Sequence, residues 1–284
     1  YEPGRPVQEG VPLMFATLLM EEARTQARRN AGVVGIMAVI AAGFMLLSLL
    51  ELPVLSSMLL VGAFVALVAM PAVVSIQIGI EYWASMSGAR AYLTMSLPVR
   101  GRVIFAAKTL YAVIAVLASA VVATLLLVGW FASFAHLLGV TLEQFFEPVR
   151  QMISLVGIGM LVFYGLTVVE GVVVMIIEVA AVMSIGAQGR WNRLGFGAPA
   201  VGLVIVYVVN QITALVATLL LPLSLDMPSG RVVGRMMLPQ FIEAIRTNQE
   251  PQLVGIGSPV AALILVAILV WWAVRAIERH TCLR

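Results

Sequence analysis

The sequence predicts an all-α integral membrane protein with six transmembrane helices. Three observations support this fold class. The 284-residue chain is 62% hydrophobic and only 11% charged, its mean hydropathy is +1.05, and its apolar residues fall into six long runs. A soluble domain is about half apolar and about a quarter charged. Because so few charges cannot cover a soluble surface, we expect most of the chain to lie in lipid.

The first expected element is an amphipathic helix over residues 11–29. Val11, Met14, Phe15 and Leu18 recur at the i, i+3, i+4, i+7 spacing of one helical face. Charged residues follow them closely. We expect this helix to lie in the inner membrane interface, either as a simple anchor or as an elbow that also contacts a cytoplasmic partner.

Six apolar segments are long enough to span a bilayer, which takes about 20 helical residues. They are Ala31–Leu50, Leu55–Ile80, Thr109–Phe134, Met152–Met175, Ala198–Leu221 and Gly257–Val274.

The fourth apolar run continues beyond its span, from Met152 to Ala187. As a helix this run would be about 54 Å long, whereas a span needs about 30 Å. We therefore expect its inner end to protrude into the cytoplasm or to break, with Gly171 and Gly186 as candidate break points.

The basic residues predict the orientation of the spans. With the N-terminus inside, only four of the 17 Lys and Arg residues lie outside, namely Arg150, Arg231, Arg235 and Arg246. This asymmetry predicts that both termini are cytoplasmic. The strong excess of Arg over Lys is typical of a GC-rich bacterium, so the expected location is a bacterial plasma membrane.

The longest hydrophilic stretch is an expected extracellular loop over residues 222–256. Within it, the segment Leu238–Arg246 has a proline near its start and apolar residues at helical spacing. We expect a short helix there, lying on the outer surface.

Several kinds of chemistry are absent from the sequence. A Walker loop needs G-x-x-x-x-G-K-[ST], but the single lysine, Lys108, follows Arg102 and Ala107 at the two glycine positions. The two histidines, His136 and His280, fall on opposite sides of the predicted membrane and cannot share a metal. We therefore expect no cofactor or metal on this chain, no catalytic residue and no nucleic-acid partner.

A few polar residues fall within the apolar runs, where they are costly in lipid. They are either hydrogen-bonded ties between helices or the lining of a substrate path. Glu170 is expected near the inner leaflet boundary, and Glu178 in the cytoplasmic extension, with a solvated or partner-facing role. The candidates for a substrate path are Gln77, Glu170, Asn210 and Gln211.

A polar stretch over residues 81–108 separates the second and third predicted spans. Within it stand Glu81, Gly88, Tyr92-Leu93, Leu97-Pro98-Val99, Arg102 and Ala107-Lys108. This pattern resembles that of the permease subunits of type-2 ABC transporters, the six-span exporter-like class. A second segment of the chain, Pro239 to Arg246, also resembles a feature common in that class.

The resemblance implies that residues 1–284 form one transmembrane permease domain with a cytoplasmic coupling helix within 81–108. That helix would seat in a separate ABC ATPase subunit, which would bind ATP and Mg²⁺, and a second permease subunit would complete the transporter. The cargo would be amphipathic or lipophilic: a peptide, a drug or a lipid. We also expect the Glu21/Glu22 end of the interfacial helix and Glu81 to brace the coupling helix through Arg90 or Arg100. The expected ATPase contacts are Glu22, Glu81, Gly88, Arg90, Tyr92, Leu97, Pro98, Arg100 and Arg102.

The sequence leaves three alternatives to a permease function open. A secondary transporter or channel would need ionisable groups near the middle of its spans, and the predicted spans place none there. A membrane scaffold without transport activity would not stimulate an ATPase. An intramembrane enzyme would need catalytic motifs that the chain lacks.

Overall fold

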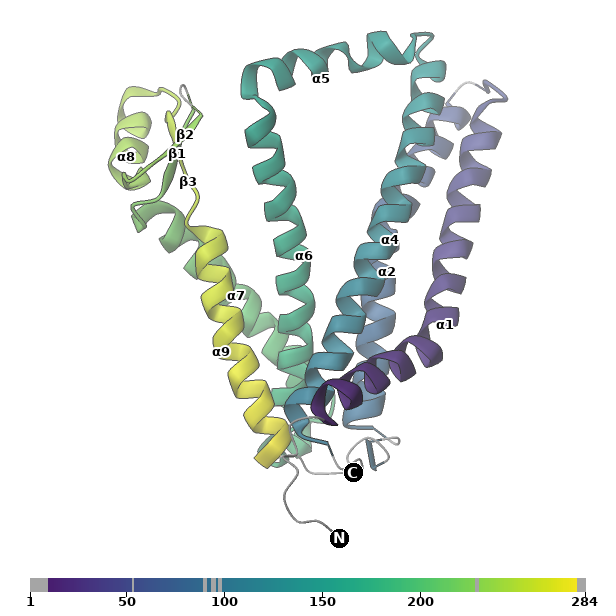
Figure 1. Cartoon of the computed structure of the whole chain (residues 1–284). Helices are drawn as coiled ribbons and strands as arrows, with labels where there is room; N and C mark the ends of the chain where they lie inside the picture. The colour runs from purple at the N-terminus through teal and green to yellow at the C-terminus, as the bar shows by residue number, and fades with distance from the viewer. Residues whose placement is uncertain are drawn as a thin grey trace. The chain divides into compact units, whose positions relative to one another are not determined.

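The computed structural model describes residues 10–52, 54–88, 91–92, 96, 99–227 and 230–279. It confirms an all-α protein in which the described residues form six long apolar helices, each a candidate membrane span (Figure 1). The chain is therefore a multi-pass membrane protein. The six candidate spans are Met14–Ser48, Leu55–Met86, Gly101–Leu137, Ile158–Gly186, Gly197–Leu220 and Ser258–Arg279.

Contacts within the chain form two compact units, which divide between Arg150 and Gln151. The first unit contains α1 (Gly10–Ser48), α2 (Leu55–Met86) and α4 (Gly101–Leu137), each packed against the other two. Fully buried residues recur every three or four positions along α2, so this helix presents its packed face to both neighbours. They include Leu60, Leu67, Met70 and Val74.

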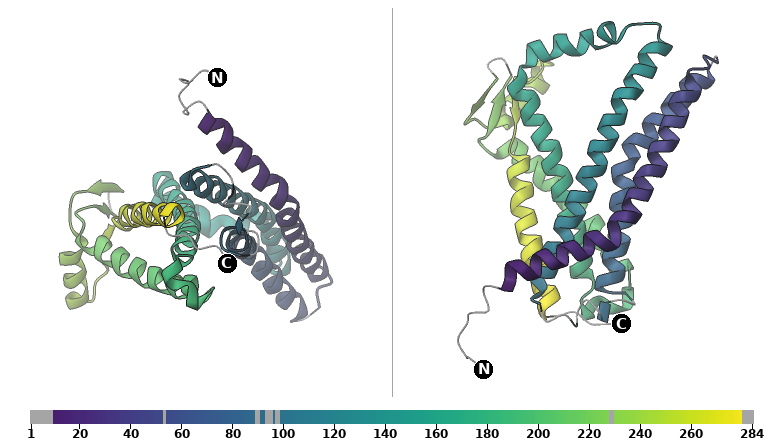
Figure 2. Two further views of the ribbon diagram at one scale, coloured as in Figure 1. Left: turned by 90° about the horizontal axis from the view of Figure 1, so that it is seen from below. Right: turned by 45° about the vertical axis from the view of Figure 1, so that its right-hand side comes forward.

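Helix α1 combines the predicted interfacial helix and the first span in one uninterrupted element. Its 39 residues make about 58 Å of helix, well beyond the thickness of a bilayer core. Figures 1 and 2 both show that its N-terminal part changes direction relative to the rest. The surplus length is therefore carried by a segment that runs across the ends of its neighbours.

A further helix, α5 (Leu142–Val156), follows α4 and was not predicted. Its start is a capping box: the backbone N–H of Gln144 donates to the Thr141 hydroxyl at 3.3 Å, and the N–H of Thr141 donates to the Gln144 side chain at 3.0 Å. Aromatic side chains fix it to the end of α4, with the Phe134 and Phe145 rings 5.8 Å apart and the Phe131 and Phe146 rings 5.3 Å apart.

The fourth candidate span, α6 (Ile158–Gly186), begins later than the predicted start at Met152. Gly157 separates it from α5 with φ 81° and ψ 149°, a conformation that is essentially restricted to glycine. Of the two candidate break points, Gly171 lies inside α6, whereas Gly186 is its last residue.

The second unit contains α6, a short 3₁₀ helix η1 (Gly189–Leu194), α7 (Gly197–Leu220) and α9 (Ser258–Arg279). Helices α6, α7 and α9 pack against one another. At Gly202 of α7, a Cβ atom would lie only 2.7 Å from Cγ1 of Val182 on α6. The two helices can approach this closely because the position has no side chain.

Between α7 and α9 the chain forms a small three-stranded sheet and the helix α8 (Met237–Thr247). The helix confirms the one predicted within the hydrophilic loop. The strands are β1 (Ser224–Asp226), β2 (Arg231–Val233) and β3 (Leu253–Gly255), in the antiparallel order β2-β1-β3. The Gln240 side chain of α8 accepts a hydrogen bond from the N–H of Leu253 at 3.0 Å, which joins the helix to the sheet.

Candidate functional site

The loop between the second and third spans is shorter than the polar stretch 81–108. Helix α2 continues past Glu81 to Met86, and α4 already begins at Gly101, so most of the predicted loop residues at either end are helical. Gly88 lies against the last turn of α2, where a Cβ would be 3.0 Å from the carbonyl oxygen of Ala84.

Three of the predicted partner-contact residues are open to the surroundings. Tyr92 is 61% exposed, Arg100 is exposed at the residue before α4, and Arg102 is exposed in the first turn of that helix. The predicted positions Arg90, Leu97 and Pro98 lie outside the described residues, so a coupling helix there stays a prediction.

At the base of this loop, polar side chains from three helices form two hydrogen-bonded clusters. The residues from α1 are four positions apart and those from α4 three apart, which places each set on one helical face, whereas the two residues from α2 are eight positions apart. The inner polar network consists of Glu22, Gln26 and Asn30 from α1, Gln77 and Ser85 from α2, and Lys108 and Tyr111 from α4.

The centre of the inner polar network is an ion pair between Lys108 and Glu22. Lys108 Nζ also donates to the Ser85 hydroxyl at 3.0 Å, and the Glu22 carboxylate accepts a hydrogen bond from the Gln26 side chain. The Lys108 side chain is 7% exposed and that of Glu22 is 17% exposed. A charge this buried requires its partner, so the pair joins α1 to α4 while Ser85 adds α2.

Further along the same three helices, Asn30 forms a second link between them. Its Nδ2 donates to the Tyr111 hydroxyl at 2.9 Å, and its Oδ1 accepts from Gln77 Nε2 at 2.7 Å. Gln77, predicted to line a substrate path, therefore acts here as a hydrogen-bonded tie between helices.

Near the surface, Arg29 NH1 lies 3.5 Å from Glu81 Oε2, with the arginine 62% exposed. Two of the three glutamates expected to brace the coupling helix thus contact basic residues on α1 and α4: Glu81 contacts Arg29, and Glu22 contacts Lys108. From the sequence, Lys108 was expected only as the end of the loop. Asn30, Ser85 and Tyr111 were not selected from the sequence. Their position as polar residues within or beside apolar runs was the signal that could have identified them.

The second unit contains a cavity of about 420 Å³ between α6, α7 and α9. Three of the four residues predicted for a substrate path line it: Glu170, Asn210 and Gln211. Gln77, the fourth, belongs to the first unit. Residues distant in sequence therefore line one cavity, and its volume is in the range found for ligand pockets. We refer to it as the polar cavity.

The two glutamates of α6 both line the polar cavity. Glu178 was expected in a cytoplasmic extension with a solvated or partner-facing role, but it is buried in the cavity wall, with its two carboxylate oxygens 2.9 and 2.7 Å from Asn210 Nδ2. Glu170, expected near the inner boundary of the membrane, lies close to the middle of α6.

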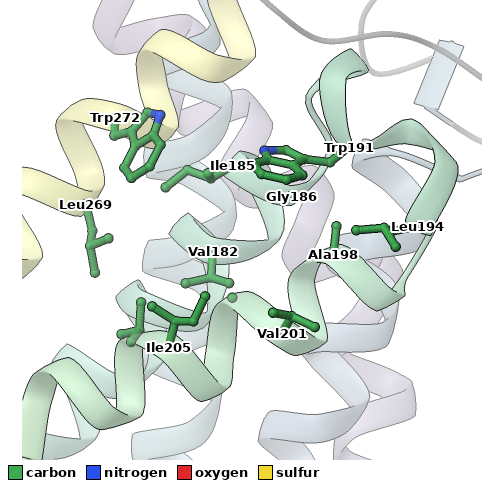
Figure 3. Close-up of a pocket in the computed structure, with 12 residues that line it drawn as sticks. Val182, Ile185, Gly186, Trp191, Leu194, Ala198, Val201, Ile205, Leu269 and Trp272 are labelled. Carbon is green, nitrogen blue, oxygen red and sulfur yellow. The ribbon is translucent and has the colours of Figure 1, made fainter.

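A second, apolar pocket of about 200 Å³ lies where α6 ends and α7 begins. Figure 3 shows Leu269 and Trp272 of α9 on one side of it and Leu194 and Ala198 on the other. With no charged residue in its described lining and mostly aliphatic and aromatic walls, this pocket suits apolar groups.

Neither site resembles a metal centre, since the described residues contain no cluster of three or more His, Cys, Asp or Glu side chains that could hold an ion. No protein family, curated protein or solved structure matches the chain.

Proposed function

We propose that this chain is the membrane-spanning permease subunit of an ATP-driven exporter of the type-2 ABC class. A separate ATPase subunit, which binds ATP and Mg²⁺, docks on the cytoplasmic loop between α2 and α4. A second permease subunit completes the complex in a bacterial plasma membrane, with both termini in the cytoplasm. The cargo is amphipathic or lipophilic.

The observation that carries this proposal is the buried Lys108–Glu22 pair with its bond to Ser85. The loop between α2 and α4 leaves α2 just after Ser85 and enters α4 shortly before Lys108. A force applied to that loop would therefore act on three helices that are joined together at its base. An exposed Tyr92 and Arg100 between these attachment points offer the partner an aromatic ring and a charge.

The continuous α1 supports the same proposal. Its N-terminal part contributes Glu22 and Gln26 to the inner polar network, so the interfacial segment is fixed to the ends of α2 and α4. Movement of the loop would then be passed along α1 into the first span.

The test is purification of the full chain at native expression in a mild detergent, followed by identification of the proteins that accompany it. We expect a stoichiometric ATPase with Walker motifs, and we expect the double variant Tyr92→Ala/Arg100→Ala to lose it. Arg246→Ala, which removes an exposed arginine from α8, is the matched control and should retain the partner. A chain that purifies alone, from cells that express such ATPases, would contradict the proposal.

A secondary transporter is a second candidate, and the position of Glu170 favours it. An ionisable group near the middle of a span and beside a cavity is what a proton-coupled carrier needs. The chain reconstituted alone into liposomes would then move substrate in response to a pH gradient. The ABC proposal expects no such transport without the ATPase.

A further inference from the structure

The polar cavity has a distinct electrostatic character. It lies against the middle of α6 and α7 and the first residues of α9. The charged side chains in its described lining are both carboxylates, Glu170 and Glu178, and no Lys or Arg is among these lining residues. Carboxylates in a membrane-depth cavity without a basic neighbour favour a positively charged occupant.

The two carboxylates differ in their hydrogen bonding. Glu178 accepts hydrogen bonds from Asn210 through both of its oxygens, so its position is fixed by the protein itself. Glu170 Oε1 is buried, and no hydrogen-bond donor reaches it among the described residues. An acceptor that is buried without a partner is costly, and rotation of the Glu170 side chain toward the cavity would let a donor brought by a ligand remove that cost.

The remainder of the lining suits an amphipathic molecule. Aliphatic side chains such as Val174, Val179 and Val206 form much of the wall, and Tyr207 offers an aromatic face that attracts cations. Gln211 adds a side-chain amide whose oxygen can accept a further hydrogen bond. The cavity thus combines two carboxylates, of which only Glu178 is bonded to Asn210, with apolar surface.

We propose that the polar cavity binds a protonated amine that carries an apolar body, with its ammonium group donating to Glu170. A quaternary ammonium would satisfy the charge but could not donate the hydrogen bond that Glu170 lacks. As a statement about cargo this inference rests on the proposed function, whereas binding itself is a property of the chain alone.

The experiment measures binding of dansylcadaverine, a fluorescent primary amine, to the full chain in phosphatidylcholine nanodiscs at pH 7. Fluorescence anisotropy reports binding, and empty nanodiscs give the background from partition into lipid. We expect saturable binding of the amine. Its N-acetylated derivative, which keeps the apolar body but has no charge, should bind at least about tenfold more weakly, as expected for loss of a charge-assisted hydrogen bond.

Three variants locate the site. Glu170→Gln is nearly isosteric and should weaken binding of the amine about tenfold while leaving the acetylated derivative unchanged. Glu243→Gln removes an exposed carboxylate from α8 in the same unit and should change neither. Gly171→Leu adds bulk where a Cβ would meet no atom within 4 Å, so it has room to fill part of the cavity and should weaken both ligands.

Equal binding of the amine and its acetylated derivative, or unchanged binding in Glu170→Gln or Gly171→Leu, would overturn the inference. This outcome is independent of the ATPase. A chain that binds the amine but recruits no ATPase retains the site and loses the proposed function. A chain that recruits the ATPase but does not discriminate the amine retains the function and loses the site.

Discussion

At the scale of single residues, the buried pair between Lys108 and Glu22 is the feature with the largest energetic consequence. Two charges removed from water are stable together only when each satisfies the other. Ser85 and Gln26 supply additional hydrogen bonds to the pair. Removing one member leaves the other charge buried, whereas removing both leaves an apolar contact.

We therefore expect Lys108→Met to destabilise the chain by roughly 3–5 kcal/mol, because Glu22 loses its counter-charge. The double variant Lys108→Met/Glu22→Leu should recover most of that loss. Thermal unfolding of the purified chain in detergent, with all four members of the double-mutant cycle, measures the coupling.

Arg29→Met is the matched control for this cycle. It breaks the exposed contact with Glu81 and should change stability by no more than about 1 kcal/mol. A single Lys108→Met variant as stable as the control would show that the pair does not hold the three helices together.

At the scale of helices and strands, apolar length and charge distribution predicted much of the fold. They located all six candidate spans and the helix α8, because long runs of apolar residues and apolar residues at helical spacing are the strongest sequence signals of a helix. They also selected Glu170, Asn210 and Gln211, which share one cavity, since polar residues in apolar runs are few and costly.

The ends of helices, the short strands and the partners of polar side chains could not be predicted in the same way. The apolar run starting at Met152 continues across Gly157 without a change in hydropathy, so only the backbone conformation of that glycine reveals the break. The Thr141–Gln144 capping box marks the start of α5 in the sequence, but hydropathy alone does not reveal it. The strands, at three residues each, are too short to show alternation. Partners such as Lys108 for Glu22 depend on tertiary contacts.

The close packing of α6 against α7 at Gly202 can be tested by substitution. A Cβ at Gly202 would lie 2.7 Å from Val182 Cγ1, so Gly202→Leu must separate the helices and should cost roughly 1–3 kcal/mol. The same replacement at Gly171, where a Cβ meets no atom within 4 Å, should be neutral or stabilising because leucine favours helix over glycine by about 0.8 kcal/mol. Thermal unfolding of both variants in detergent makes the comparison. If both variants lose the same amount of stability, the close approach of α6 and α7 is not the reason why Gly202 needs to be a glycine.

At the scale of the whole molecule, six spans place successive loops on alternating sides of the membrane. The basic residues predict that the loop between α2 and α4 is cytoplasmic and that residues 222–256, which contain α8, are extracellular. This assignment determines whether the proposed ATPase can reach its docking residues, because ATP is cytoplasmic.

Single cysteines test the assignment directly. In a Cys282→Ser background, which removes the only natural cysteine, Tyr92→Cys and Arg246→Cys each place one thiol at an exposed position. With a membrane-impermeant maleimide on intact cells, we expect Arg246→Cys to label and Tyr92→Cys to label only after permeabilisation, since the positive-inside rule puts them on opposite faces. The reverse pattern would place Tyr92 and Arg100 outside, beyond the reach of any cytoplasmic ATPase. The inner polar network would then be only a structural tie, and a carrier that works through Glu170 would become the better explanation of the chain.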